Sequence, residues 1–528
     1  MSIKRQKQLF KIILISGFFL IQSISFAIPS GGLSSISLIP KPVSVTSAPG
    51  NFSLTKKSSI CISGKSHELT TIGEYLSGKL RTATGFKMVV NAAAKTKASG
   101  NIYLSISKFD KQLGDEGYQL SIKGGMINLS ANNPAGLFNG IQTIRQLLPP
   151  KIESSSIQPG PWQIPAGTIR DFPEYSYRGA MLDVARHFFQ VEDVKRYIDQ
   201  ISAYKMNVLH LHLSDDQGWR IEIKKWPKLT SIGGSSQVGG EKGGFYTQKQ
   251  YSEIVKYASE RNITIIPEID MPGHTNASLA SYPELNCNNK ATELYSGTEV
   301  GFTSLCTSKD LTYQFISDVL SELAEITPGP YLHIGGDESH VTKLEDYIPF
   351  VNRVQEIVGK LGKKVIGWDE IALSTLRPNS FVQYWAKAEN AVLGVKQGAK
   401  VIMSPAANSY LDMKYDSTTL LGLHWAGYVE VDQSYNWDPA TLVKGVAKEN
   451  ILGVEAPLWT ETVTNMNELE QMVFPRLLGI ADLAWRSSSS GNWNEYKIRL
   501  GNQAERLKAL NIAYYPSKLV PWVTELKN

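Results

Sequence analysis

The sequence predicts an α/β protein in which a (β/α)8 barrel follows a smaller α+β domain. From about residue 175 onward, short apolar segments alternate with amphipathic helical patterns, and eight such segments follow one another. Before that point the pattern changes to short alternating strands with few helices. The 528 residues also exceed what one ordinary core accommodates. We therefore expect a signal peptide over 1–27, an α+β domain over 28–170 and a barrel over 171–528.

The first 27 residues have the three parts of a secretory signal peptide. These parts are the basic residues Lys4, Arg5, Lys7 and Lys11, the apolar run Ile12–Ile21, and the small-x-small end Ser25-Phe26-Ala27. An uncleaved membrane anchor is the alternative, but the apolar run is short for a span of about 20 residues. We expect cleavage after Ala27, export to a periplasm or the outside, and no membrane anchor afterwards.

Composition excludes several classes of protein. With 42% hydrophobic and 20% charged residues, the chain is neither disordered nor fibrous. The net charge is +5, but the signal peptide removes four of 54 basic residues and none of the 49 acidic ones, which leaves +1. Because no other cluster of Lys and Arg is present, we expect no nucleic-acid partner.

The chain has three cysteines, too few for a small disulfide scaffold or a zinc ribbon. Cys287 and Cys306 flank a polar segment, and export would place them in an oxidising compartment. We predict a disulfide between these two residues. Cys61 remains, and we expect it to be a small buried apolar residue.

The α+β domain is predicted from short patterns. Residues 102–106 and 118–122 alternate as half-buried strands do. A helix over 134–148 has one apolar face and is stopped by Pro149-Pro150. Residues 28–50 are predicted to be a lead-in, and 151–165, rich in Ser and Pro, a linker. No cluster of catalytic groups is apparent in this part.

The barrel strands are predicted from eight apolar runs. They lie near 180–184, 207–213, 263–268, 330–334, 364–367, 380–384, 400–403 and 452–456. A first helix carries Val194, Ile198 and Ile201 on one face, and a second opens with a capping box from Thr247 to Gln250. A last helix is expected near 467–484. An open doubly wound sheet is the alternative, which a Gly-rich phosphate loop after the first strand would favour, and the sequence has none there.

Polar and aromatic residues follow nearly every predicted strand, where a barrel of this kind has its active site. In chain order they are Asp183, Arg186, His187, Asp215, Asp216, Glu268, Asp270, His274, Asp337, Glu338, Trp368, Asp369, Glu370, Tyr384, Trp385, Tyr410, Asp412, Trp459 and Glu461. Carboxylates and Arg bind sugar hydroxyls, and Trp rings stack on the apolar faces of pyranoses. Glycoside cleavage needs an acid for the leaving oxygen and a group that stabilises positive charge. The adjacent Asp337 and Glu338 could supply both.

The segment from Tyr331 to Glu338 contains His-x-Gly-Gly-Asp-Glu and resembles the motif of family 20 glycoside hydrolases, the β-N-acetylhexosaminidases. Five further segments match that family in order. They are 183–188 (Asp-Val-Ala-Arg-His-Phe), 212–219 (His-Leu-Ser-Asp-Asp-Gln-Gly-Trp), 267–274 (Pro-Glu-Ile-Asp-Met-Pro-Gly-His), 367–370 (Gly-Trp-Asp-Glu) and 410–412 (Tyr-Leu-Asp). The resemblance runs from about residue 40 to 510.

The resemblance implies a retaining enzyme without an enzyme nucleophile, in which the substrate's 2-acetamido oxygen attacks the anomeric carbon and gives an oxazolinium intermediate. Glu338 would be the general acid and then the base, and Asp337 would orient the acetamide N–H. Tyr410 would donate to the acetamide oxygen, and Asp215 with His274 would form a relay that tunes Glu338.

The same resemblance assigns substrate-binding residues. Trp368, Trp385 and Trp459 would wall the acetamide pocket, Arg186, Glu461 and Asp412 would bind sugar hydroxyls, and Trp425 would stack on the next sugar. The expected substrate is an oligosaccharide with a terminal N-acetylglucosamine or N-acetylgalactosamine, and no cofactor or metal is expected.

Other hypotheses remain open at this point. A metal-dependent hydrolase would also have carboxylates and several His at the barrel mouth, and His210 and His212 could act as ligands. A catalytically inactive sugar-binding protein and a disaccharide-releasing relative are the remaining two. We also expect Asp183 to be structural, paired with an Arg, and Glu370 to cap the helix that follows it.

Overall fold

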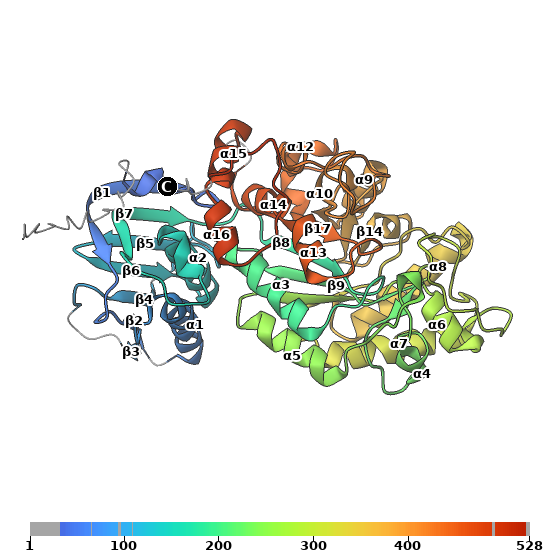
Figure 1. The fold of residues 1–528 in the computed structure, drawn as a ribbon. Helices are drawn as coiled ribbons and strands as arrows, with labels where there is room; N and C mark the ends of the chain where they lie inside the picture. The colour runs from blue at the N-terminus through green and yellow to red at the C-terminus, as the bar shows by residue number, and fades with distance from the viewer. Residues whose placement is uncertain (1–31, 65, 93–96, 108, 488–490, 524–528) are drawn as a thin grey trace, which may run out of the picture.

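The computed structural model describes residues 32–64, 66–92, 97–107, 109–487 and 491–523. The predicted signal peptide, 1–27, lies outside them. The chain forms two bodies side by side, a sheet domain at the N-terminal end and a barrel (Figure 1). None of the helices in the described ranges is both long and apolar enough to cross a membrane.

The N-terminal domain is a seven-stranded mixed sheet with two helices packed on it. Strand order is β1-β7-β5-β6-β4-β2-β3. The elements are β1 (Ser44–Ser53), β2 (Ile60–Ile62), α1 (His67–Thr84), β3 (Val90–Ala92), β4 (Ile102–Ile106), β5 (Tyr118–Lys123), β6 (Met126–Ala131), α2 (Pro134–Leu147) and β7 (Gln163–Asp171). The predicted strands at 102–106 and 118–122 and the helix from 134 are present.

Two predictions at the edges of this domain are wrong. Part of the expected lead-in forms β1, which pairs with β7 from Ser44↔Arg170 to Ser53↔Gln163. The expected linker leads back into the sheet as β7 and does not join the domains. β1 escapes detection because it is mostly exposed, so that no run of buried side chains marks it. β7 is mostly buried, and exposure does not explain why it was missed.

The barrel closes as predicted, with eight parallel strands in chain order. They are β8 (Tyr177–Asp183), β9 (Val208–His212), β12 (Thr264–Glu268), β13 (Tyr331–His333), β14 (Lys364–Trp368), β15 (Phe381–Tyr384), β16 (Lys400–Met403) and β17 (Ile451–Leu458). β17 pairs with β8 and completes the circle, which excludes the open doubly wound sheet. A short hairpin, β10 (Ser214–Asp215) with β11 (Gly218–Trp219), lies just after β9.

Helices surround the strands (Figure 1). They are α3 (Val191–Ala203), α4 (Lys228–Ser231), α5 (Gln248–Ser259), α6 (Asn276–Ser281), α7 (Asp310–Glu325), α8 (Leu344–Lys360), α9 (Ala388–Lys396), α10 (Ala406–Ser409), α11 (Val431–Tyr435), α12 (Pro439–Leu442), α13 (Met466–Val473), α14 (Arg476–Trp485), α15 (Trp493–Gly501) and α16 (Ala504–Ala509). The capping box at Thr247 is formed.

The regular alternation fails in three places. The helix expected at 467–484 is divided into α13 and α14, because Phe474 is extended and Pro475 has no N–H to continue the helix. Only a short 3-10 helix, Asp369–Leu373, follows β14. The connection after β16 is long and carries only three short α-helices and a 3-10 helix, Lys448–Asn450, so that its loops extend over the barrel mouth.

The predicted disulfide between Cys287 and Cys306 is present. It closes the polar loop that follows α6 at the barrel mouth. Cys61 is buried and unpaired, as expected.

The two domains are joined by contacts between charged side chains, one buried and one partly exposed. Arg178 on β8 donates two hydrogen bonds to the Glu116 carboxylate, with Nη1–Oε2 at 2.8 Å and Nη2–Oε1 at 2.7 Å. Lys79 on α1 lies 3.4 Å from Asp199 on α3. These contacts place α1 of the small domain against the outer helices of the barrel.

Candidate active site

The loop after β13 holds two adjacent carboxylates at the barrel mouth. Gly335 and Gly336 both have positive φ, 64° and 103°. A Cβ at Gly335 would lie 1.7 Å from Asp270 Oδ1, so that only glycine fits there. Glu338 itself has φ 44°, a backbone conformation that residues other than glycine rarely adopt outside functional sites. The Gly-Gly pair therefore allows the chain to turn sharply and present Asp337 and Glu338 to the mouth.

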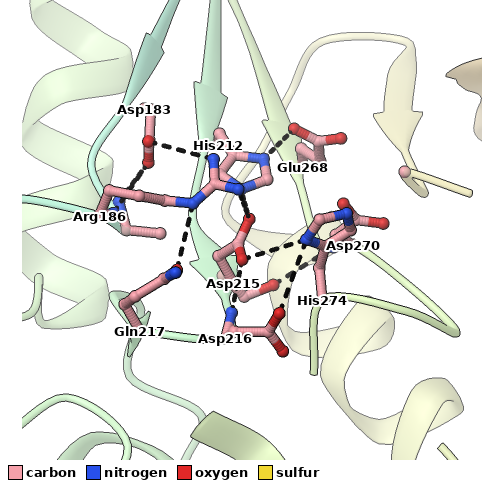
Figure 2. Close-up of polar contacts among 12 residues, drawn as sticks. Asp183, Arg186, His212, Asp215, Asp216, Gln217, Glu268, Asp270 and His274 are labelled. Carbon is pink, nitrogen blue, oxygen red and sulfur yellow. Dashed lines mark hydrogen bonds and ion pairs between the residues drawn. The ribbon is translucent and has the colours of Figure 1, made fainter. Parts of the chain in front are cut away.

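Asp215 is the centre of a cluster of charged side chains that includes Arg186, His212 and His274 (Figure 2). Its Oδ2 lies 2.8 Å from His212 Nε2 and 2.9 Å from Arg186 Nη2. Its Oδ1 lies 3.2 Å from His274 Nδ1. The opposite ring nitrogen of His274, Nε2, is 3.6 Å from Glu338 Oε2. The arrangement matches the relay that the family resemblance implied.

The relay groups have strongly shifted pKa values. Burial alone would raise the pKa of Asp215, but Arg186 and His274 outweigh it and hold that pKa well below its usual range. Burial would lower the pKa of His274, yet Asp215 and Asp270 raise it well above 6.5. The relay thus places a protonated imidazole beside Glu338.

Asp337 is more enclosed than Glu338. Its side chain is 9% exposed and that of Glu338 26%. Burial, followed by the nearby Asp270, raises the pKa of Asp337 well above its ordinary value. Two neighbouring carboxyls in such a site disfavour full ionisation of both, which is how glycosidases keep an acid protonated.

Aromatic rings form one wall of the mouth. Trp368 and Trp459 have ring centroids 5.7 Å apart, and Tyr410 lies 6.3 Å from Trp459. The ring of Trp385 is nearly parallel to that of Tyr410 at 6.4 Å. Trp425 meets both at 5.9 Å, edge to face, and is 56% exposed. The first four of these rings belong to one apolar cluster, and the exposed Trp425 lies at its edge.

The predicted hydroxyl-binding groups lie together beside Trp459. Arg186 Nη1 is 3.9 Å from Glu461 Oε1 and 3.3 Å from Asp183 Oδ2. Among the described residues, neither oxygen of Asp412 has a hydrogen-bond partner, nor has Oε2 of Glu461. Buried acceptors of this kind are costly unless a ligand uses them. Asp183 pairs with an Arg, as expected, and also accepts from the backbone N–H of Ala185 and Thr460.

Glu370 has a different role from the expected one. Its Oε2 accepts a hydrogen bond from Trp385 Nε1 at 3.1 Å. The neighbouring Asp369 accepts from the backbone N–H of Trp385, Ala386 and Lys387, and from Asn390 Nδ2 at 2.7 Å. Together the two carboxylates hold the loop that carries Trp385. The adjacent carboxylates Asp369 and Glu370 could be singled out from the sequence. Their hydrogen-bond partners in the loop of Trp385 could not.

Gln217 was also missed. Its Oε1 accepts from Arg186 Nε at 3.1 Å and so fixes the guanidinium that faces Asp215 (Figure 2). The residue lies between the two strands of the β10–β11 hairpin, directly after Asp215 and Asp216. The sequence pattern does not distinguish this Gln from an ordinary polar residue in a turn.

Comparisons with known proteins identify the family. The model of "Glycosyl hydrolase family 20, catalytic domain" matches residues 175–346 and 339–488, and that of "Glycosyl hydrolase family 20, domain 2" matches 35–172. The chain belongs to glycoside hydrolase family 20. A β-N-acetylhexosaminidase of Cellulomonas fimi is 38% identical over 490 residues, covering 92% of this chain and 97% of that protein.

Solved structures of family members superimpose closely on this family 20 enzyme. A GH20 β-N-acetylhexosaminidase from Streptomyces coelicolor has a TM-score of 0.89 at 49% identity and covers 92% of this chain and 99% of its own. A mutant Streptomyces plicatus β-hexosaminidase in complex with the product GlcNAc also has a TM-score of 0.89 at 49% identity, covering 92% and 98%. The family and the barrel architecture are therefore confirmed.

Clusters with metal-like spacing occur in the described part of this enzyme. In each, the ligand atoms lie within 4.8 Å of one another. The groups are His210–Glu268–His333, His212–Asp215–Asp270, Asp215–Asp216–His274 and Asp270–His274–Asp337. In these groups Asp215 already accepts from Arg186, His212 and His274, and Glu268 from Trp368. The oxygens of Asp215 and Glu268 are thus already used by neighbouring side chains, whereas Asp270, His274 and Asp337 each keep one buried polar atom without a hydrogen-bond partner among the described residues. The absence of a metal requirement stays a prediction.

The buried carboxyls predict how stability depends on pH. Burial, with Asp369 and Asp337, raises the pKa of Glu370 from 4.5 to about 8. A group whose pKa is raised on folding stabilises the folded state below its unfolded pKa and loses that contribution as pH rises through the folded pKa. His274, also raised, acts in the same direction above 6.5. We expect the thermal midpoint of the ligand-free enzyme to be several degrees lower at about pH 8 than at about pH 5.

Calorimetry at the two pH values measures this difference. Glu370→Gln removes one of the titrating groups and should reduce the slope, whereas Glu345→Gln, on the exposed surface of α8, should not. A midpoint that rises toward pH 8 would contradict the assignment.

Proposed function

We propose that this family 20 enzyme is an exo-acting retaining β-N-acetylhexosaminidase. The observation that carries the proposal is that Asp337 and Glu338 lie close enough to Tyr410 to add to burial in raising the pKa of its hydroxyl, and that Tyr410 packs with three Trp rings. An acid next to a hydroxyl donor and aromatic rings that can hold an acetamido group is what neighbouring-group catalysis needs. The Streptomyces plicatus relative that holds GlcNAc supports N-acetylglucosamine as a product.

The first step forms a ring within the substrate. Glu338 gives its proton to the glycosidic oxygen, which leaves as an alcohol. The acetamido oxygen attacks the anomeric carbon from the opposite face, so that a C–O bond forms as the glycosidic bond breaks. Asp337 accepts the acetamide N–H and balances the positive charge of the oxazolinium. Tyr410 donates its O–H to the acetamido oxygen and fixes its direction.

The second step opens that ring with water. Glu338, now a carboxylate, takes a proton from the water molecule that attacks the anomeric carbon. The C–O bond to the acetamide breaks, and the sugar leaves with its original configuration. His274, held by Asp215, lies beside Glu338 throughout and supports its change from acid to base.

Release of a single sugar follows from the groups at the end of the pocket. The guanidinium of Arg186 can donate to the hydroxyls of one terminal residue, and the buried acceptor atoms of Asp412 and Glu461 can accept from them. A disaccharide-releasing relative would need that end to be open for a further sugar. Trp425 at the rim suits the leaving sugar by stacking on its apolar face.

A thiazoline analogue of the cyclic intermediate provides the sharpest test. We expect it to inhibit hydrolysis of an aryl N-acetyl-β-glucosaminide competitively, binding at least about 10²-fold more tightly than the substrate. Wild-type enzyme that fails to turn over the aryl substrate would instead favour the inactive sugar-binding protein. Turnover without thiazoline inhibition would indicate an enzyme nucleophile.

Chelation tests the metal-dependent alternative. Because the proposed steps use only side chains and the substrate's own acetamide, we expect exhaustive dialysis against EDTA to leave turnover unchanged. Elemental analysis of the dialysed sample provides the control that metal was removed. Loss of activity with recovery on addition of a divalent ion would overturn this mechanism.

We further propose that the mature chain is exported, on the basis of the basic and apolar segments in residues 1–27. N-terminal sequencing of the protein recovered from the cell envelope or the medium of a bacterial host should begin at Ile28. An intact Met1 in a membrane fraction would indicate an uncleaved anchor.

A further inference from the structure

Beneath the active site, Glu268 is the last residue of β12 and points into the barrel among three histidines. Strand register places it beside His212 on β9 and His333 on β13. Its Oε2 hydrogen-bonds with His212 Nδ1 and lies 3.1 Å from His210 Nε2. Its Oε1 accepts from Trp368 Nε1 at 2.8 Å and lies 2.9 Å from His333 Nδ1. One fully buried carboxylate thus has four nitrogen neighbours.

Two of these neighbours lead directly into the reaction site. His212 uses its other nitrogen, Nε2, to bind Asp215, so that it bridges Glu268 and the relay (Figure 2). The His212 ring also packs edge-on against Trp459, with centroids 4.9 Å apart. Trp368, which Glu268 binds directly, is the neighbouring wall of the same pocket.

We propose that Glu268 is a positioning residue that aligns the acid–base relay through His212 and the acetamide pocket through Trp368. It contacts no part of the substrate itself. The proposal rests on the proposed function above, because it assigns Glu268 a role in that reaction.

The charges of the cluster agree with this role. Burial would raise the pKa of Glu268, but His333, His212 and His210 outweigh it and hold it well below its usual range. Burial would lower the pKa of His212, yet Glu268 and Asp215 raise it well above 6.5. An ionised Glu268 therefore keeps His212 protonated, and only a protonated ring can donate to Glu268 and Asp215 at once.

A second carboxylate in the barrel serves as a matched control. Glu455 on β17 is as buried as Glu268 and also binds His210, with Nδ1–Oε1 at 3.0 Å. Its other partners are Gln383 Nε2 at 2.7 Å and the Tyr177 hydroxyl. Among the described residues, its hydrogen bonds and ion pairs reach neither His212 nor Trp368. Loss of its charge perturbs the barrel interior and reaches Glu268 only through His210.

The decisive variant is Glu268→Gln. An amide has one acceptor oxygen in place of two, so it cannot accept from both His212 and Trp368. We expect kcat for a chitobiose-type substrate, whose sugar leaving group needs a proton, to fall about 10–100-fold, the usual scale for residues that orient functional groups. With a dinitrophenyl leaving group, which departs unprotonated, we expect a clearly smaller loss, up to about tenfold in the first step, because only the alignment of the acetamide then matters. Affinity for the thiazoline should fall about tenfold.

The outcomes separate positioning from general stability. Glu455→Gln should show neither the leaving-group dependence nor the loss of thiazoline affinity. Equal losses for the two substrates, or the same pattern in Glu455→Gln, would overturn the proposal. Wild-type enzyme that hydrolyses neither substrate would refute the proposed function instead. Should Glu268→Gln not fold, His212→Gln tests the relay branch, and the same loss on both substrates would overturn it.

Discussion

Glu338→Gln is expected to lower turnover of an aryl N-acetyl-β-glucosaminide by about 10²–10⁴-fold, the scale of general acid–base catalysis. Gln has nearly the volume of Glu, so the turn after Gly336 is kept while the proton is lost. The same residue serves both steps, since it protonates the leaving oxygen and then activates water. Steady-state rates at pH values between about 5 and 8 measure the effect.

The pH profile adds a second criterion. Loss of the acid should remove the decline of kcat/KM at high pH, because that decline reports deprotonation of the acid in the free enzyme. Glu345→Gln, seven residues further along on the exposed surface of α8, is the matched control and should behave as wild type. Unchanged turnover in Glu338→Gln would refute the assignment of the acid.

The barrel could be predicted from the sequence because each of its strands is buried on both faces. All seven residues of β8 and all five of β9 are buried, which gives short, largely apolar runs in the sequence. β1 lacks that signal because most of its residues are exposed. Pro475 alone did not predict that the helix is interrupted there, because proline is also common in the first turn of a helix.

The residues at the mouth could be predicted, whereas their partners beneath it could not. Asp337 and Glu338 follow a strand directly, and a barrel brings all strand ends to one face. Glu268, however, meets Trp368 100 residues away, and His210 meets Glu455 245 residues away. Those pairs depend on the register between strands and on rotamers inside the barrel. Neither leaves a pattern in a single sequence.

Asp171→Asn is expected to destabilise the folded chain by about 3–5 kcal/mol, the usual cost of removing one partner of a buried ion pair. Asp171, at the end of β7, lies 2.8 Å from the Nζ of Lys205, which follows α3 in the barrel. It also accepts from Tyr118 Oη at 2.7 Å and from Trp485 Nε1 at 2.8 Å. Both charged side chains are buried. The variant therefore leaves an ammonium group without its counter-ion between the two domains.

The urea midpoint, measured for wild type and variant in the same buffer, gives the difference. Asp110→Ala breaks an ion pair with Arg170 that is largely exposed, and it should change the midpoint little. A midpoint of Asp171→Asn equal to that of the control would contradict the role of the pair.

The loss of folding stability caused by Asp171→Asn should itself depend on pH. Burial lowers the pKa of Lys205, and Asp171 opposes that effect in the wild type. Without Asp171 the pKa of Lys205 falls further, so that the folded variant binds fewer protons than the unfolded chain and gains stability as pH rises. The gap between the two midpoints should therefore narrow from about pH 6 to about pH 9. Adding Lys205→Met to the variant removes the titrating group, and the gap should then be smaller and independent of pH. That pattern would assign the loss of stability to the unpaired charge. A difference in urea midpoint from wild type that stays constant with pH in both variants would assign the loss to packing at Tyr118 and Trp485.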